Sequence, residues 1–107
     1  MPKKGRREAV VIGDASLVIS PNPAPIGTTR LDISGAGFSA NTYLTGTILG
    51  RAPSFECPSD ANGFIKGVWE NENAPLGVGV VNTAETHSVT IADAQGNVVL
   101  IQNFEVV

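Results

Sequence analysis

The side chains that could carry chemistry are few in this sequence, and they form no catalytic pattern. Cys57 is the sole cysteine, with Glu56 beside it and no base nearby in the sequence. A nucleophilic thiol needs such a base or a positive environment, so we do not expect thiol catalysis. His87 is the sole histidine, and its place in a predicted strand favours packing over catalysis. Glu70 and Glu72 are interpreted as solvated carboxylates, and the chain is predicted not to be an enzyme.

Four oxygen-bearing residues lie in two predicted turns, Asp60 and Asn62 in "DANG" and Asp93 and Asn97 around "DAQG". Calcium binds such oxygens, but the spacing does not match a twelve-residue calcium loop. Turn chemistry explains these residues instead, because Asp opens a turn through its side chain and Gly closes it in a left-handed conformation. We therefore expect no metal site and no cofactor.

Tyr43 and Trp69 are the residues that a sugar-binding module would use as stacking platforms. The chain has six aromatic residues in all, and the sequence shows no cluster of them. We therefore favour a core or interface position for Trp69, and keep ligand stacking by the two side chains as the alternative.

Positive charge is concentrated at the N-terminus, where Lys3, Lys4, Arg6 and Arg7 lie. The rest of the chain holds three basic and ten acidic residues, a net charge of −7. Four charges give only weak, salt-sensitive affinity for nucleic acid, so we do not expect a nucleic-acid partner. We interpret residues 1–14 as a basic arm that binds an acidic neighbouring surface, with a solvated tail as the alternative.

The elements that position these residues are predicted to be short strands. Gly and Pro are abundant, at 12 and 7 residues, and no window has a sustained helical period or the length of a membrane span. Strands are expected at 8–13, 16–20, 28–34, 42–50, 64–70, 86–92 and 98–107, with a further short one at 78–81. Residues 51–63 read as irregular, and the prolines of 21–27 as an extended connector that cannot donate to a ladder. The pattern predicts an all-β chain with one antiparallel β-sandwich of about seven strands over residues 15–107.

The last strand raises a question of register, because Val98–Ile101 is apolar without a break. A four-residue loop would pair Ala92 with Asn97 and turn Val98 toward the core, together with every second residue after it. A three-residue loop with a bulge would pair Asp93 with Asn97 and invert the set.

We prefer the first register, because it places Phe104 and Val106 in the core row. Val99 and Ile101 then lie on the outer face as two large aliphatic side chains. Burying each such side chain is worth about 1.5–3 kcal/mol, so the pair predicts an interface with another subunit. Coverage by an N-terminal or connecting segment of the same chain is the alternative.

Three stretches resemble the immunoglobulin-like modules of bacterial and phage proteins: "ISGAGFSANTYLTGTI", "DANGF" and "SVTIADAQGNVV" followed by "FEV". The resemblance covers residues 16–107 and implies an immunoglobulin-like β-sandwich. Such modules occur in surface adhesins, secreted enzymes and phage virion proteins, so the resemblance alone does not assign a role.

The chain begins with a methionine, and its start does not have the pattern of a signal peptide. We therefore expect a phage virion protein that is assembled in the host cytoplasm and has no membrane partner. The specific hypothesis is a capsid decoration or minor capsid protein that binds and stabilises the shell through its arm and last strand. Its partners would be capsid or tail subunits and, on the particle, further copies of itself. The alternatives are a tail or baseplate component and a carbohydrate- or cell-surface-binding module.

Overall fold

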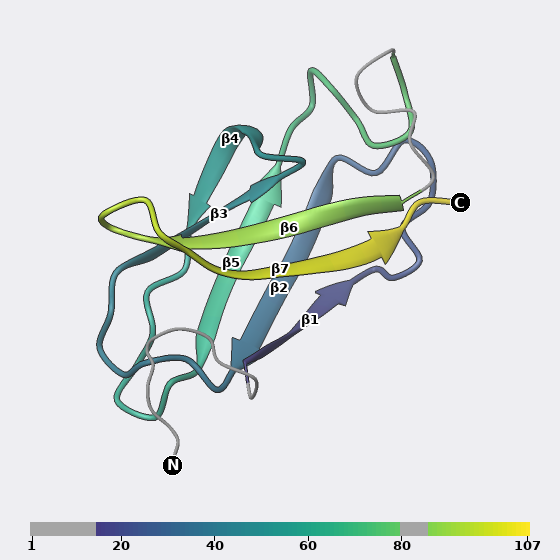
Figure 1. Ribbon diagram of the computed structural model, residues 1–107. Coiled ribbons are helices and arrows are strands. Elements are labelled where there is room, and N and C mark those ends of the chain that lie inside the picture. Colours follow the sequence, from purple (N-terminus) through teal and green to yellow (C-terminus); the bar gives the residue numbers. More distant parts are fainter. Residues whose placement is uncertain (1–14, 80–85) are drawn as a thin grey trace.

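The structure is a computed structural model, and it describes residues 15–79 and 86–107. These residues form seven strands and no helix (Figure 1). The strands are β1 (Ser16–Ser20), β2 (Arg30–Ala36), β3 (Leu44–Ile48), β4 (Arg51–Glu56), β5 (Ile65–Glu70), β6 (Thr86–Asp93) and β7 (Val98–Glu105). In this part of the chain there is accordingly no helix long and apolar enough to cross a membrane. The predicted arm and its strand, residues 1–14, lie outside the described residues.

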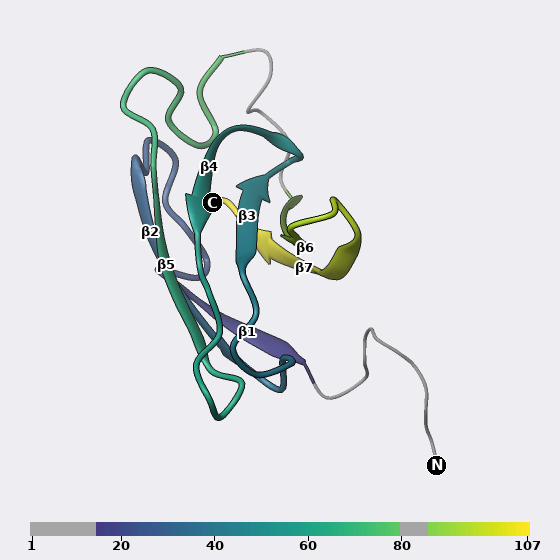
Figure 2. The ribbon, with the colours of Figure 1, turned by 90° about the vertical axis from the view of Figure 1, so that its left-hand side faces the viewer.

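The strands form two antiparallel sheets, which pack face to face (Figure 2). One sheet has the order β1-β2-β5 and the other the order β4-β3-β6-β7. These orders correspond to strands A, B and E and to strands C′, C, F and G of the immunoglobulin fold. The prediction of a single antiparallel, immunoglobulin-like β-sandwich is confirmed.

Alternating side chains build the core between the sheets, as the sequence pattern predicted. In β2, Leu31 and Ile33 are buried while Arg30 and Asp32 are exposed. Because successive side chains of a strand point to opposite faces, one apolar row per strand is enough to fill the space between two sheets. Phe38, in the turn that follows β2, is also buried, as expected for an aromatic anchor.

The prediction of an irregular segment over residues 51–63 was wrong for its first half, which forms β4. Only Phe55 of this strand is buried, so the sequence shows no alternation there. Pro53 is tolerated because β4 is an edge strand, where a missing N–H does not break a ladder. The Phe55 ring packs where side chains are absent at Gly46 and Gly67, and thereby fills the core from the edge.

The proline-rich connector, residues 21–27, pairs with the end of the chain, contrary to the expectation that it could not donate. The Ala24 N–H donates to the Glu105 carbonyl at 2.7 Å, and the Ile26 N–H to the Val107 carbonyl at 2.7 Å. Prolines occupy every second position here, so the residues between them keep their N–H groups. The connector therefore forms a short parallel contact, centred on Ala24, that holds the C-terminus.

The connector after β5 is anchored by Leu76, which is fully buried. The Leu76 N–H donates to the Thr28 carbonyl at 2.9 Å, and the Gly27 N–H donates to the Leu76 carbonyl at 2.7 Å. A short strand was predicted at 78–81. Residues 78 and 79 are not in a strand, and residues 80 and 81 lie outside the described part of the chain.

Candidate interaction surface

The turn between β6 and β7 is closed by Asp93. Its N–H donates to the Asn97 carbonyl at 2.9 Å, and its carbonyl accepts from the Gly96 N–H at 3.0 Å. Asp93 therefore faces Asn97 across a three-residue loop. At the turn itself this is the second of the two registers considered, and the preference for a four-residue loop was wrong.

A β-bulge then restores the core row of the first register beyond the turn. Ile91 pairs with Leu100 but Ala92 pairs with Val98, so Val99 is the extra residue. A bulge shifts the side-chain parity by one residue. Phe104 consequently lies in the core, with an exposed fraction of 3%, as predicted.

The same bulge redistributes the four apolar residues at the start of β7. Val98 and Ile101 are exposed, at 54% and 58%, whereas Val99 and Leu100 pack against the core. The placement of Val99 on the outer face and of Val98 in the core was therefore wrong. Ile101 does lie on the outer face, as expected. The exposed aliphatic pair of β7 is Val98 and Ile101.

Gln102 occupies a core-facing position in β7 and bridges the two sheets. Its Nε2 donates to the Leu17 carbonyl at 2.8 Å, and its Oε1 accepts from the Leu17 N–H at 2.9 Å. The side-chain amide thus takes the place of a neighbouring strand at the edge of β1. By parity alone, Gln102 belongs to the core row of the first register, and a lone amide in this apolar row is the signal that could have identified the bridge.

The outer face of the four-stranded sheet is mostly uncharged and rich in hydroxyl groups. Neighbouring strands form the rows Thr45–Ala92–Val98 and Thr47–Thr90–Ile101, followed by Ser88 opposite Asn103. We call these eight residues the hydroxyl face. Among the residues that the structure describes, charged side chains lie only at its margins, on the edge strands β4 and β7.

Tyr43 lies next to this face, immediately before β3. Its ring is 48% exposed, and its hydroxyl donates to Glu56 Oε2 at 3.1 Å. This hydrogen bond to a carboxylate raises the pKa of Tyr43, because the phenolate would lose the donor and repel Glu56. Tyr43 is therefore an accessible aromatic residue with a fixed hydroxyl.

Trp69 cannot serve as a stacking platform, because it is buried in the core with an exposed fraction of 3%. It belongs to β5 of the opposite sheet, so the structure does not bring Trp69 and Tyr43 together. The favoured core position of Trp69 is confirmed and follows from its parity with Ile65, whereas the alternative of a ligand-stacking pair with Tyr43 was wrong.

The carboxylates of Asp60 and Asp93 accept hydrogen bonds from backbone N–H groups of their turns, as predicted. Asp60 Oδ1 accepts from the N–H groups of Asn62 and Phe64 at 2.8 and 3.0 Å. Asp93 Oδ1 accepts from Asn97 and Gln95 in the same way, and the hydrogen bond from the Asn97 N–H lowers the pKa of Asp93. Among the described residues, no group of three or more His, Cys, Asp and Glu side chains is arranged to hold a metal ion.

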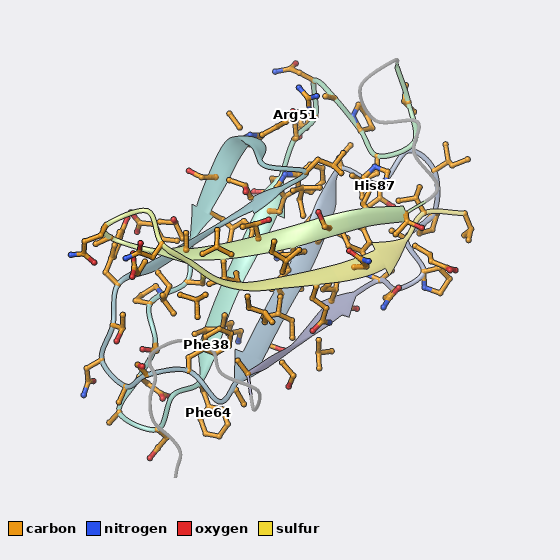
Figure 3. All side chains as sticks on the ribbon, viewed as in Figure 1. Phe38, Arg51, Phe64 and His87 are labelled. Atoms are coloured by element: carbon orange, nitrogen blue, oxygen red, sulfur yellow. The ribbon has the colours of Figure 1, made fainter. Side chains whose placement is uncertain are left out.

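The remaining candidate residues lie apart from one another. Cys57 is fully buried, and desolvation raises the pKa of its thiol to about 11. His87 is 1% exposed and points into the molecule, with its ring 5.7 Å from that of Phe104 (Figure 3). Glu70 is exposed, 3.9 Å from Arg30. The basic residues of the predicted arm (Lys3, Lys4, Arg6 and Arg7) lie outside the described residues.

No family model matches the chain, and no curated protein sequence matches it. Among solved structures, macromomycin is similar to this chain, with a TM-score of 0.58 and 16% sequence identity. The similarity covers 87% of this chain and 99% of the macromomycin chain. At this level of identity the likeness concerns the fold alone.

Proposed function

We propose that this chain is a non-enzymatic structural protein of a phage virion. In this proposal it acts as a capsid decoration or minor capsid protein that binds the assembled shell and stabilises it. The observation that supports a binding role is the exposure of Val98 and Ile101 on edge strand β7, within the hydroxyl face. The basic arm, residues 1–14, provides a second contact in this proposal.

The chemistry of the hydroxyl face indicates the kind of surface that it fits. Two aliphatic side chains and a row of hydroxyl groups match a partner that is apolar at its centre and offers hydrogen bonds around it. The margins carry Glu56 on β4 and Glu105 on β7, so basic residues at the partner's rim would increase the association rate and fix its orientation.

The virion setting is supported by the resemblance of residues 16–107 to phage immunoglobulin-like modules. A tail or baseplate component uses the same surface in the same way, and the experiment below includes both locations. The sugar-binding alternative has lost one of its two aromatic platforms, because Trp69 is buried.

The test is whether the chain binds purified particles of the phage that encodes it. Wild-type protein is expected to be present in gradient-purified particles by mass spectrometry, and to co-sediment with particles stripped of it. Ile101→Lys is expected to weaken co-sedimentation by at least about tenfold, because a charge replaces an apolar contact at the interface.

The matched control is Ile26→Lys, at an isoleucine that is 62% exposed and hydrogen-bonded to Val107, beyond the end of β7. Ile26→Lys is expected to bind like the wild type. Deletion of residues 1–12 tests the arm separately, and loss of binding with increased salt sensitivity is expected. Absence of the chain from purified particles, or equal binding by Ile101→Lys and the wild type, would contradict the proposal.

A further inference from the structure

The outer face of the three-stranded sheet also exposes apolar residues. Val18 on β1 is 67% exposed, Phe64 just before β5 is 54% exposed, and Val68 on β5 is 37% exposed. Phe64 points out of the molecule (Figure 3). We call the outward residues of β1, β2 and β5, together with Phe64, the three-stranded face.

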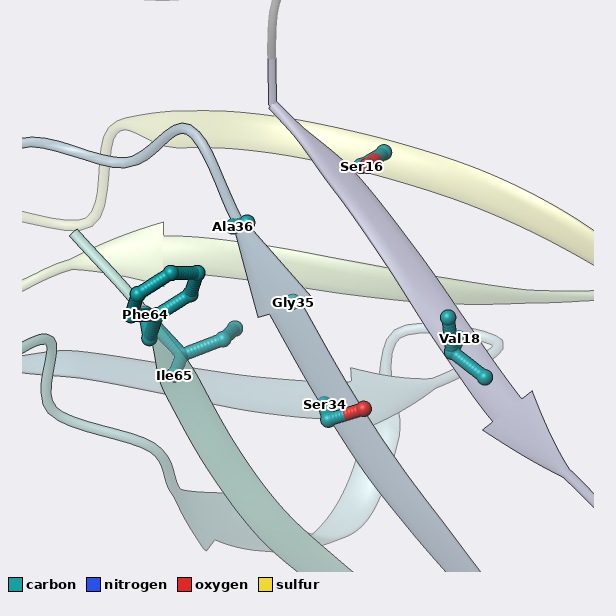
Figure 4. A pocket seen from close by; sticks show the side chains of 7 residues that line it. All are labelled: Ser16, Val18, Ser34, Gly35, Ala36, Phe64 and Ile65. Carbon is teal, nitrogen blue, oxygen red and sulfur yellow. The ribbon is translucent and has the colours of Figure 1, made fainter.

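This face is hollowed at one end. Val18 and Phe64 lie on either side of β2, which contributes only the small residues Ser34, Gly35 and Ala36 between them (Figure 4). The shallow hollow has a volume of about 320 Å³. Two walls of apolar side chains over a floor of small residues can admit protruding apolar side chains of another surface.

The charges on the same face balance one another. Among the described residues, it carries two cationic side chains, Arg30 and Lys66, and two carboxylates, Asp32 and Glu70. Arg30 lies 3.1 Å from Asp32 and 3.9 Å from Glu70, and all three are exposed by more than half. The three-stranded face is therefore neutral, and it displays both signs of charge to a partner.

The rest of the described molecule is acidic. Outside this face, the described residues hold one cationic side chain, Arg51, and five carboxylates: Glu56, Asp60, Glu72, Asp93 and Glu105. Two copies that approach through the surfaces that carry these carboxylates repel each other, whereas two three-stranded faces meet without net repulsion. Charge therefore favours contact between copies through this face.

We propose that the three-stranded face is a self-association surface, on which a second copy of this chain packs with its own three-stranded face. Such a contact uses the same patch on both copies. The three-stranded face can complement itself, because it carries charges of both signs and has protruding side chains as well as a hollow. The surface lies on the opposite sheet from the hydroxyl face, so the proposal does not rest on the proposed function.

The size of the three-stranded face determines how tightly two copies are expected to bind each other. Three strands of about five residues cover roughly 14 by 17 Å, which is small for a stable dimer. The free chain is therefore expected to dimerise weakly. On a particle, a chain bound through its hydroxyl face turns its three-stranded face outward, where it is open to a second copy.

The test is the molar mass of the full chain, measured by sedimentation equilibrium between about 10 µM and about 1 mM, the range in which small interfaces associate. The wild-type mass is expected to rise toward that of a dimer. Val18→Lys and Phe64→Ser are each expected to raise the dissociation constant at least about tenfold. Ile26→Lys, whose substituted residue lies outside both faces, is expected to dimerise like the wild type.

A charge variant tests the electrostatic part of the proposal. Arg30→Glu makes the face acidic, so its dimerisation is expected to be weaker at low salt and to recover at high salt. A wild-type chain that stays monomeric at the highest concentration, or a dimer unaffected by Val18→Lys and Arg30→Glu, would overturn the proposal. Particle binding is measured separately with Ile101→Lys, so failure of the proposed function is recognised independently.

Discussion

The contribution of the β6–β7 turn to stability depends on pH through the carboxylate of Asp93. Its carboxylate accepts backbone N–H groups of the turn, so the pKa of Asp93 in the folded chain lies below its ordinary value of 3.8. The stabilisation is present above pH 3.8 and is lost as the pH falls through the lower folded pKa. Asp93→Asn is expected to flatten this loss of stability at acidic pH. Urea unfolding of both chains across the acidic range measures the difference, and parallel curves would contradict the assignment.

The pKa of Cys57 is shifted in the opposite direction, upward. Burial disfavours the thiolate and raises the pKa of Cys57 to about 11, so the neutral thiol is stabilised and this contribution is lost only as the pH rises toward that value. Because the thiolate is the reactive form, alkylation by iodoacetamide at pH 8 is expected to require unfolding. Mass spectrometry should show alkylation in denaturant and almost none in buffer. Rapid alkylation of the folded chain would show that the thiol is accessible.

Among whole elements, the edge of β1 depends on Gln102. The Gln102 amide satisfies both backbone groups of Leu17, in a partly buried place. Gln102→Leu leaves these groups unpaired and is expected to lower the free energy of unfolding by about 1–3 kcal/mol. Asn103→Ala, at the exposed neighbouring position, is the control and should change it by less than about 0.5 kcal/mol. Equal effects in denaturant titrations would rule out the bridge.

The packing of β4 depends on the absence of side chains in its neighbours. A methyl group at Gly67 would lie 2.7 Å from the Phe55 ring, and one at Gly46 would lie closer still. Gly46→Ala is therefore expected to cost about 1–3 kcal/mol of stability through overpacking. Phe55→Leu in the same chain should recover part of that loss, which a double-mutant cycle measures. Additive losses would show that the two positions do not interact.

These elements also show where sequence reasoning works in a β protein. Alternation identified β2 correctly, because its inner and outer residues differ sharply in polarity. It failed for β4, where one phenylalanine faces the core and Pro53 reads as a breaker. The start of β7 could not be resolved because Val98–Ile101 is apolar throughout, so a bulge changes burial without changing the pattern. Of the candidate surface residues, Ile101 is exposed and Trp69 is in the core, as favoured from the sequence, whereas the position of Val99 depended on a bulge that spacing alone does not reveal.

For the whole molecule, the two sheets present different outer faces. The hydroxyl face is mostly uncharged with acidic margins, and the three-stranded face is neutral with both signs of charge. Because the faces lie on opposite sides of one core, a contact on one leaves the other free (Figure 2). Under the two proposals, one chain can therefore bind a particle and a second copy at the same time.

Simultaneous use of both faces predicts a second layer of copies on the particle. A chain that binds the particle through its hydroxyl face turns its three-stranded face outward, so a second copy can pack on it without touching the particle. Wild-type occupancy is therefore expected to rise above the single-layer value at concentrations where the free chain dimerises, up to about twice that value. Val18→Lys removes the contact between copies and is expected to saturate at the single-layer value with unchanged affinity for the particle. Quantified co-sedimentation over a concentration series measures both curves, and identical curves for the wild type and Val18→Lys would show that no second layer forms.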